Sequence, residues 1–298
     1  MVGSLNMDTV LTVGALPRPG QTVLATSTRT APGGKGANQA VAAARAGAQV
    51  RFVGAVGDDD ASVRLRRHLA ANGVGTAGLV TVPGPSGSAV VVVDTAGENT
   101  IVVDPGANAR LQMSAARADV IVADCQVLLV QLEIPVAAAL AAARMARAAG
   151  ALVMVNAAPA PQTGDNLDHD VAALAELTDV VVVNQTESEA WTYPVAHRVI
   201  TRGARGARYA GPDGTVDVPA PAVRAVDTAG AGDVFTGVLA AHWLSDRHDA
   251  LRRACVAGAL ATRVRGAGDC APRTEAIEAA IEAAIEADTG ADTGNLGK

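Results

Sequence analysis

Short apolar segments alternate with Ala-rich segments from about residue 119 onward, and this pattern restricts the possible folds more than any other feature. The short segments lack the polar alternation of a half-exposed strand, so they predict strands that are buried on both faces. The Ala-rich segments between them are long enough for helices that connect parallel strands. The expected strands are Val127–Leu132, Leu152–Val155, Val180–Val183 and Arg198–Thr201, and the helices between them include Pro135–Ala149 and Val171–Leu177.

We therefore expect a three-layer α/β domain over residues 1–287, with a mostly parallel, Rossmann-like central sheet and helices on both faces. Hydrophobic residues make up 49% of the chain and aromatic residues only 2%, so Ala, Val and Leu must fill the core. The start Val2–Ser4 is typical of the end of a buried strand that begins upstream of Met1. Residues 288–298 repeat Ala-Asp-Thr-Gly and are expected to be disordered. Further expected elements are a strand over Gln49–Val56, hairpins over 87–104 and 209–218, and helices over Gly36–Gly47, Ala61–Asn72, Val234–Leu244, Ala250–Arg265 and Thr274–Ala287.

Charge and cysteine content exclude several classes of protein. The formal net charge is −6 and there is no long basic run, which argues against a nucleic-acid groove or an anionic membrane surface as partner. The three cysteines Cys125, Cys255 and Cys270 are far apart and odd in number, so they predict neither a disulfide framework nor a zinc site. Reduced thiols and the absence of a signal-peptide pattern at the start predict a cytoplasmic protein.

Each of the four expected parallel strands ends in a polar or flexible residue. These ends are Glu133, Asn156, Asn184 and the segment Thr201–Gly203. Ligands of open parallel sheets bind beyond the carboxyl ends of the strands, so these residues predict one ligand crevice. The alternative, that strands end in polar residues only because loops are hydrated, explains one such residue more easily than four.

The strongest local motif is Asp227–Asp233, which reads Asp-Thr-Ala-Gly-Ala-Gly-Asp and precedes an expected helix. Small residues before a helix leave backbone N–H groups exposed, and the helix dipole adds partial positive charge there. Such a segment forms an anion hole suited to a phosphoryl group, and Asp233 at its mouth is placed to accept or orient the proton of an attacking hydroxyl. The alternative is a Gly-rich turn in which Asp233 caps the helix.

A second Gly-rich segment, Gly33–Gln39, also opens a helix but is not a Walker A loop, because Gly36 rather than Ser or Thr follows Lys35. Asn38 offers the donor and acceptor groups that a polyhydroxylated sugar needs. The alternative is a tight turn with a solvated Lys35. In the segment Gly3–Asp8, Asn6 and Asp8 lie two apart and would project to the same side of a strand, where they can bind neighbouring hydroxyls. The alternative there is an ordinary polar strand end.

The segment Asn184–Glu187 supplies an amide and a carboxylate at another strand end. A carboxylate near a triphosphate acts through Mg²⁺ and its waters, because Mg²⁺ keeps much of its hydration. Asn followed by Glu is also a helix-capping pattern, and the two interpretations are compatible.

With these motifs in this order, the chain from Gly3 to about Pro272 resembles the ribokinase family of carbohydrate kinases, which includes fructokinases and adenosine kinase. The motifs that carry the resemblance are Gly33–Ala40 and Asp227–Asp233. The resemblance implies an ATP-dependent kinase that phosphorylates a sugar, with ribose favoured. It implies Asn6, Asp8, Gly34, Lys35, Asn38, Glu133 and Asp233 as sugar ligands, and Asn184, Glu187, Thr201, Gly203, Gly206 and Gly232 as ligands of ATP and Mg²⁺. It also implies an anion hole at Gly230, Ala231 and Gly232, with Asp233 as catalytic base.

The same resemblance implies a monovalent cation, usually K⁺, beside the anion hole. The matching positions are Asp227, Ala229, Ala261, Val264, Gly266 and Cys270, of which Cys270 stands where these enzymes often carry Ser. Residues 9–32 and 79–104 would form a β lid over the sugar, and two lids would clasp to make a homodimer. A lid that excludes water keeps ATP from hydrolysis in place of transfer.

Other activities remain as alternatives at this level. Fructose, deoxyribose or adenosine is a possible acceptor on the same fold, because the pocket walls contributed by the lid are not readable from sequence. A non-catalytic sugar-binding protein is the alternative of a different class, and the presence of Asp233 with the anion-hole glycines argues against it. A dehydrogenase is excluded because no Gly-x-Gly-x-x-Gly follows the first strand.

Overall fold

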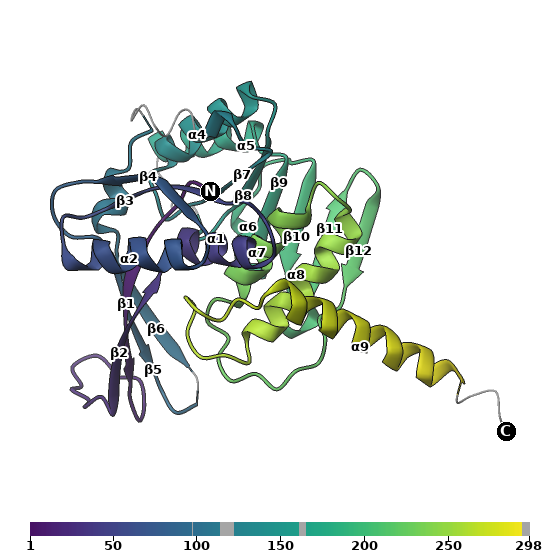
Figure 1. Ribbon diagram of the computed structural model, residues 1–298. Coiled ribbons are helices and arrows are strands. Elements are labelled where there is room, and N and C mark those ends of the chain that lie inside the picture. The colour runs from purple at the N-terminus through teal and green to yellow at the C-terminus, as the bar shows by residue number, and fades with distance from the viewer. Residues whose placement is uncertain (97, 114–121, 161–164, 294–298) are drawn as a thin grey trace.

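The structure, a computed structural model, describes residues 1–96, 98–113, 122–160 and 165–293. A central β-sheet carries helices on both faces, and a smaller sheet projects from one end of the molecule (Figure 1). Within the described part of the chain, no helix is both long enough and apolar enough to cross a membrane.

The central sheet confirms the expected parallel arrangement. Its larger part has the order β12-β11-β10-β9-β8-β7, and β7 to β10 run parallel to one another. The pair β3-β4 lies beside β7, separated from it by Val2, which bridges Val53 and Val130 in parallel fashion. The strands are β3 (Arg51–Val56), β4 (Gly75–Thr81), β7 (Val127–Gln131), β8 (Leu152–Asn156), β9 (Val180–Asn184), β10 (His197–Thr201), β11 (Ala207–Gly211) and β12 (Gly214–Val218).

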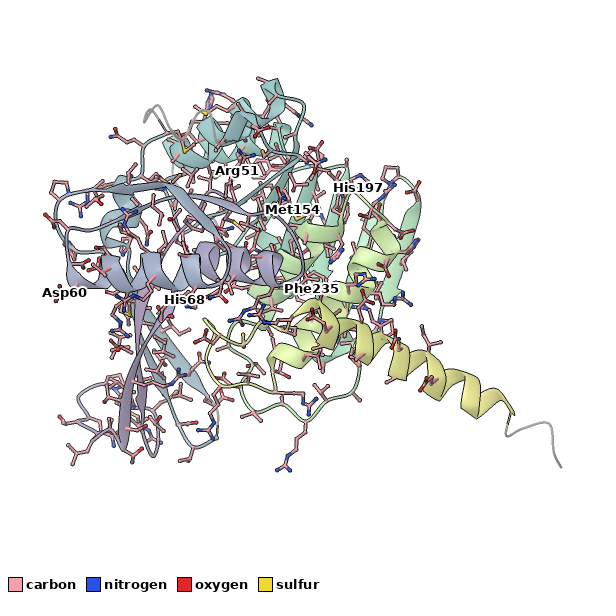
Figure 2. The ribbon with its side chains drawn as sticks, viewed as in Figure 1. Arg51, Asp60, His68, Met154, His197 and Phe235 are labelled. Carbon is pink, nitrogen blue, oxygen red and sulfur yellow. The ribbon has the colours of Figure 1, made fainter. Side chains whose placement is uncertain are left out.

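The apolar strands are buried on both faces, as their uninterrupted hydrophobic sequences predict. In β9, Val181 and Val183 pack in the cluster that contains α4 and α5, whereas Val180 and Val182 pack in the cluster beneath α7 and α8. Met154 of β8 and Phe235 of α7, both labelled in Figure 2, belong to this second cluster. The alternation fixes the strand register, because a slip of one residue would exchange the two faces.

Helices begin and end close to the expected residues. Asp59 and Asp246 cap α2 and α8 by accepting hydrogen bonds from backbone N–H groups three residues further on. The helices are α1 (Lys35–Arg45), α2 (Asp60–Ala71), α4 (Val136–Ala148), α5 (Asp165–Glu176), α6 (Gln185–Ala190), α7 (Ala231–His242), α8 (Arg247–Ala261) and α9 (Thr274–Thr293), with short 3₁₀ turns η1 (Gly106–Arg110) and η2 (Gly203–Arg205).

A four-stranded sheet, which we call the lid sheet, has the order β2-β1-β5-β6 and projects away from the central sheet (Figure 1). Its strands are β1 (Asn6–Thr12), β2 (Ser27–Gly33), β5 (Gly87–Val93) and β6 (Asn99–Asp104). The expected second segment, 79–104, began too early, because Leu79 lies in β4 and pairs with Gly54 of β3. Leu79 is buried and packs in the helical cluster beside β3, so its apolar character serves the central core.

Three helix bounds differ from expectation by four residues or more: α5 begins at Asp165 rather than at Val171, and α8 and α9 end elsewhere than expected. We expected α8 to continue to Arg265, but it ends at Ala261, where the carbonyl of Thr262 accepts hydrogen bonds from the backbone of Val226 and Asp227. This tertiary pairing stops a segment whose composition would otherwise continue the helix. The tail expected to be disordered from residue 288 is helical to Thr293, because a helix that has begun extends at little cost. Residues 294–298 lie outside the described part.

The double-sided core predicts a contrast between two leucines. Leu174 is fully buried between α5 and the sheet, whereas Leu244 is 55% exposed. Leu174→Ala leaves a cavity and should lower the free energy of unfolding by about 2–5 kcal/mol. The matched change Leu244→Ala should alter it by less than about 0.5 kcal/mol. Urea denaturation followed by circular dichroism measures both, and equal losses would contradict this placement of the core.

Candidate active site

The N-terminus of α7 lies at the segment for which the sequence predicted an anion hole. Helix α7 begins at Ala231, after Gly230, and no side chain caps it. Gly230 has a φ of +79°, and a Cβ there would lie 2.7 Å from the Cα of Ala267, so only glycine fits. Gly230 and Gly232 line a cavity of about 140 Å³. The uncapped first turn therefore lies against an open space, which makes it available to an anion.

Asp233 lies in the first turn of α7 and is held by two amide side chains from α1. Its Oδ2 accepts a hydrogen bond from Nδ2 of Asn38 at 3.0 Å, and its Oδ1 accepts one from Nε2 of Gln39 at 2.9 Å. The residue is only 9% exposed and lines the same cavity. Asn38 and Asp233 are thus in direct contact, although they lie 195 positions apart in the sequence.

On the lid side of the site, Asn6 and Asp8 both lie in β1, as expected. Asn108, buried in η1, donates a hydrogen bond to Oδ1 of Asn6 at 2.8 Å and so fixes that amide. The pKa of Asp8 is raised to about 7, chiefly by burial and then by the carboxylates of Glu133 and Asp233, while Arg29 opposes them.

Besides Oε1 of Gln131 at the end of β7, two buried acceptor atoms at this site have no hydrogen-bond partner among the described residues. They are Oδ1 of Asp8 and Oδ1 of Asn38. Leaving a buried acceptor unpaired is costly, so each is suited to a ligand that donates a hydrogen bond. Hydroxyl groups of a sugar supply such donors.

Glu133 follows β7 and joins three segments of the site. Its Oε2 accepts hydrogen bonds from the hydroxyl of Ser4 at 2.6 Å and from the backbone N–H of Lys35 at 3.0 Å. Gly34, at the N-cap of α1, has a φ of +91°, and a Cβ there would lie within 3 Å of the backbone of Leu5 and Asn6. The turn into α1 is thus packed directly against the start of β1.

Lys35 is the cation nearest to the anion hole in the cavity, which it lines together with Asn184, Glu187 and Gly230. Burial lowers the pKa of Lys35, but the carboxylates of Asp233, Glu133 and Glu187 outweigh burial, so the pKa lies above its ordinary value. The ammonium group is therefore charged at neutral pH. Lys35 lines the cavity together with Asp233, which the resemblance assigned to the sugar, and with Asn184 and Glu187, which the resemblance assigned to ATP and Mg²⁺.

Asn184 and Glu187 form the capping box of α6. Oδ1 of Asn184 accepts from the N–H of Glu187, and Oε2 of Glu187 accepts from the N–H of Asn184, both at 2.8 Å. Both side chains also line the cavity, as does Thr201, and burial raises the pKa of Glu187. Gly203 and Gly206 lie in the η2 turn after β10, with φ values of +58° and +81°, and do not line the cavity.

The loops expected to hold a monovalent cation meet at Asp227. Its two oxygens accept hydrogen bonds from the N–H groups of Ala229 and Gly266, each at 2.9 Å. The Sγ of Cys270 lies 3.8 Å from the carbonyl oxygen of Ala229, and burial raises the pKa of this thiol to about 11. The carbonyl oxygens suit K⁺ and the neutral thiol does not. Of the other expected cation ligands, Val264 is 45% exposed, and its backbone N–H donates a hydrogen bond to the carbonyl oxygen of Ala261.

No group of three or more His, Cys, Asp or Glu side chains in the described residues is arranged to hold a metal ion. Side chains of the chain alone therefore do not form a metal centre there. A site for Mg²⁺ would need oxygens from a phosphate ligand and water in addition to Glu187.

Several residues of the site received no role from the sequence. They are Ser4, Gln39, Asn108, Gln131 and Asn156, all buried polar side chains. Asn156 was noticed only as a polar strand end, and Gln39 lies inside the Gly33–Gln39 motif. The signal that could have identified these residues is a polar residue inside an otherwise apolar element, because a buried polar side chain in a folded protein needs a hydrogen-bond partner.

Comparison with known proteins agrees with this site. Residues 1–274 match the pfkB family carbohydrate kinases. The chain belongs to this family. This carbohydrate kinase is 37% identical over 244 residues to the ribokinase of Bacillus subtilis (strain 168), covering 80% of this chain and 83% of that protein. It is 32% identical over 298 residues to the deoxyribokinase of Salmonella typhi, covering 92% and 95% of the two chains.

A solved structure supports the fold of the kinase as a whole. The structure of Arabidopsis thaliana ribokinase complexed with ribose and ATP matches with a TM-score of 0.83 and 26% identity, over 93% of this chain and 96% of that chain. The central sheet, the two helical layers and the lid sheet thus form a ribokinase fold, as expected from the sequence motifs.

The raised pKa of Asp8 predicts a pH-dependent stability. The folded-state pKa of about 7 lies above the ordinary 3.8, so between these values the folded state holds a proton that the unfolded chain releases. The free energy of unfolding therefore falls as pH rises through this window. Asp8→Asn should raise this free energy by about 1–3 kcal/mol relative to wild type at pH 8, and by much less near pH 4.

Denaturant unfolding at pH 4, 6 and 8 measures this difference in the kinase without ligands. The exposed Leu244 offers a control, since Leu244→Ala changes no ionisable group and should give a difference that hardly varies with pH. A constant difference for Asp8→Asn as well would show that Asp8 is not protonated in the folded kinase.

Proposed function

We propose that this carbohydrate kinase transfers the γ-phosphoryl group of ATP to the hydroxymethyl oxygen of D-ribose and forms ribose 5-phosphate and ADP. The observation that supports it most is the convergence of Asp233, the uncapped N-terminus of α7 and the charged Lys35 on one cavity. Relatives named ribokinase, and a ribokinase complexed with ribose and ATP, point to the same acceptor.

The residues of the cavity have separate roles in the reaction. Asp233 accepts a hydrogen bond from the sugar hydroxyl and takes its proton as the new bond from oxygen to phosphorus forms. The bond from the γ-phosphorus to the ADP oxygen breaks, and the amides of Gly230, Ala231 and Gly232 stabilise the charge that the transferred group carries. Lys35 neutralises phosphate charge on the opposite side of the cavity.

The resemblance to ribokinases supplies further ligands on each side. On the sugar side, Asn6, Asp8, Gly34, Asn38 and Glu133 bind hydroxyls, with the unpaired oxygens of Asp8 and Asn38 as acceptors. On the nucleotide side, Asn184, Glu187, Thr201, Gly203 and Gly206 contact ATP. Glu187 would hold Mg²⁺ through water, and the ion would neutralise charge on the phosphates.

A monovalent cation, K⁺, would lie between the loops joined by Asp227, with oxygen ligands from Asp227, Ala229, Ala261, Val264 and Gly266. The thiol of Cys270 is a poor ligand for this hard cation, so Cys270 would contribute its carbonyl oxygen or none. The cation would hold the loop that precedes α7, because Asp227 bonds to the amide of Ala229 within that loop.

Deoxyribose is the second candidate acceptor, since a relative of similar identity is named deoxyribokinase. The two unpaired acceptors favour the sugar with the additional hydroxyl group. A panel of ribose, deoxyribose, fructose and adenosine, assayed by coupled ADP detection with and without K⁺, decides between them. We expect the highest kcat/KM for ribose. A higher kcat/KM for another acceptor would make that acceptor, rather than ribose, the substrate.

The assignment of Asp233 predicts a large loss of turnover on substitution. Asp233→Asn keeps the shape of the residue but removes the proton acceptor, so kcat for ribose should fall by about 10²–10⁴-fold. Ribose binding measured by calorimetry should change by less than about tenfold, because Asn6, Asp8 and Asn38 remain. Turnover close to that of wild type would remove Asp233 from the mechanism.

We also propose that two copies of the kinase pair through their lid sheets. Val90 and Val102 are opposite each other in the β5–β6 pair, on one face of the lid sheet, and are 41% and 66% exposed. Such a group of neighbouring exposed apolar side chains is typical of an interface. A second copy of the same sheet would cover it.

Sedimentation velocity tests this pairing. Val102→Asp places a charge in the apolar group and should shift the kinase from dimer to monomer at micromolar concentration. Val63 of α2 is 56% exposed and lies outside the lid sheet, so Val63→Asp serves as the control and should leave the dimer intact. A monomeric wild type, or a dimeric Val102→Asp variant, would contradict the proposed interface.

A further inference from the structure

A chain of buried amide side chains connects Asp233 to the carboxyl ends of three strands. Gln39 is fully buried, and its Nε2 donates to Oδ1 of Asp233 at 2.9 Å and to Oδ1 of Asn156 at 2.8 Å. Its Oε1 accepts from Nε2 of Gln131 at 2.7 Å. Gln131 and Asn156 are the last residues of β7 and β8, and Nδ2 of Asn156 donates to the carbonyl of Val182 in β9.

This arrangement permits only one orientation of each amide. If Gln39 were rotated by 180° about its last bond, its oxygen would face two acceptors, the Asp233 carboxylate and Oδ1 of Asn156. If Asn156 were rotated, its oxygen would face the carbonyl of Val182. The hydrogen bonds with Gln131 and Asn156 at the strand ends therefore fix the orientation of the Gln39 amide, so that one of its two N–H bonds points at Asp233 and the other at Asn156.

The backbone is shaped to bring this amide to Asp233. A Cβ at Gly237 of α7 would lie 2.3 Å from the carbonyl oxygen of Gln39 and 2.8 Å from Cβ of Ala42. Glycine at this position lets α1 and α7 approach closely enough for the side chain of Gln39 to reach the first turn of α7. A merely space-filling residue at position 39 would not need a polar side chain there, where burial is complete.

We propose that Gln39 is a positioning residue for catalysis: with Gln131 and Asn156 behind it, it fixes the carboxylate of Asp233 in the orientation that accepts the proton of the sugar hydroxyl. The inference rests on the proposed role of Asp233. A hydrogen bond donated to a carboxylate favours its charged form, and only the charged form accepts the proton of the sugar hydroxyl. Asn38 supplies the matching donor to Oδ2, so each oxygen of Asp233 has one amide.

Two substitutions separate this role from a packing role. Gln39→Met keeps the volume and removes the donor, so Asp233 is harder to ionise and the acidic limb of the rate–pH profile should move up by about one pH unit. Gln39→Glu keeps the shape and places a second carboxyl group against Asp233. The pair then shares one proton, and the variant should gain a new alkaline limb when that proton is lost.

The readout is the single-turnover rate constant at saturating ATP and ribose between pH 5 and 9. The other titratable or charged groups near Asp233 are Lys35, Asp8, Glu133, Glu187, Asp227 and Cys270. All are present in both variants, so a displacement from the wild-type profile reports on position 39. Because the limb moves by about one pH unit, Gln39→Met should be at most about tenfold slower than wild type below the limb and should approach the wild-type rate above it.

Thr178 offers a matched control, because it is buried and its hydroxyl donates to the carbonyl of Leu174, in α5 on the other helical layer. Thr178→Val should leave the profile unchanged. If both Gln39 variants are slower at every pH with unmoved limbs, or show the wild-type profile, the positioning role is refuted. If Gln39→Met does not fold, Gln39→Glu decides alone by the presence or absence of the alkaline limb.

The outcome for Asp233→Asn keeps this inference separate from the proposed function. If that variant retains full activity, the proposed role of Asp233 fails and the inference fails with it. If Asp233→Asn is inactive while the Gln39 variants keep the wild-type profile, only the positioning role of Gln39 is lost.

Discussion

The site depends on the close packing of α1 against α7, which brings the N-termini of two helices to the same end of the central sheet. Lys35 begins α1 and Ala231 begins α7, and Gly237 leaves the space that this approach requires. Because both helices direct partial positive charge toward the cavity, they offset the negative charge of the carboxylates around it. Without this contact, Asp233 would lose both amide donors, since both come from α1.

The acidic groups around the cavity explain why the unliganded site is unfavourable. Burial and then the carboxylates of Glu133 and Asp233 raise the pKa of Asp8 to about 7. Burial lowers the pKa of Lys35, but the carboxylates of Asp233, Glu133 and Glu187 hold it above its ordinary value. Strongly perturbed groups of this kind gather at functional sites, because an arrangement suited to a ligand is not the most stable arrangement without it. Hydroxyl donors at Asp8 and an anion at Lys35 would relieve much of this imbalance.

The sequence predicted the local features of the site and missed the ones that depend on distant contacts. The strand ends, the anion hole and the two Gly-rich helix starts follow from periodicity and glycine placement, which act over a few residues. The hydrogen bond from Gln39 to Asp233 spans 194 positions, and Asn108 reaches Asn6 across 102. Leu79 was assigned to the wrong sheet for the same reason: an apolar strand is compatible with either sheet, and only tertiary packing decides.

The lid sheet and the sugar side of the site are parts of one continuous segment. Strand β1 carries Asn6 and Asp8, and β2 pairs with it from Ser27 to Gly33 before the chain turns into α1. Any movement of the lid sheet that bends these strands also moves Asn6, Asp8 and the turn at Gly34. In the function that we propose, a sugar bound at Asn6 and Asp8 therefore acts directly on the lid sheet, and exclusion of water by that sheet would be linked to sugar binding.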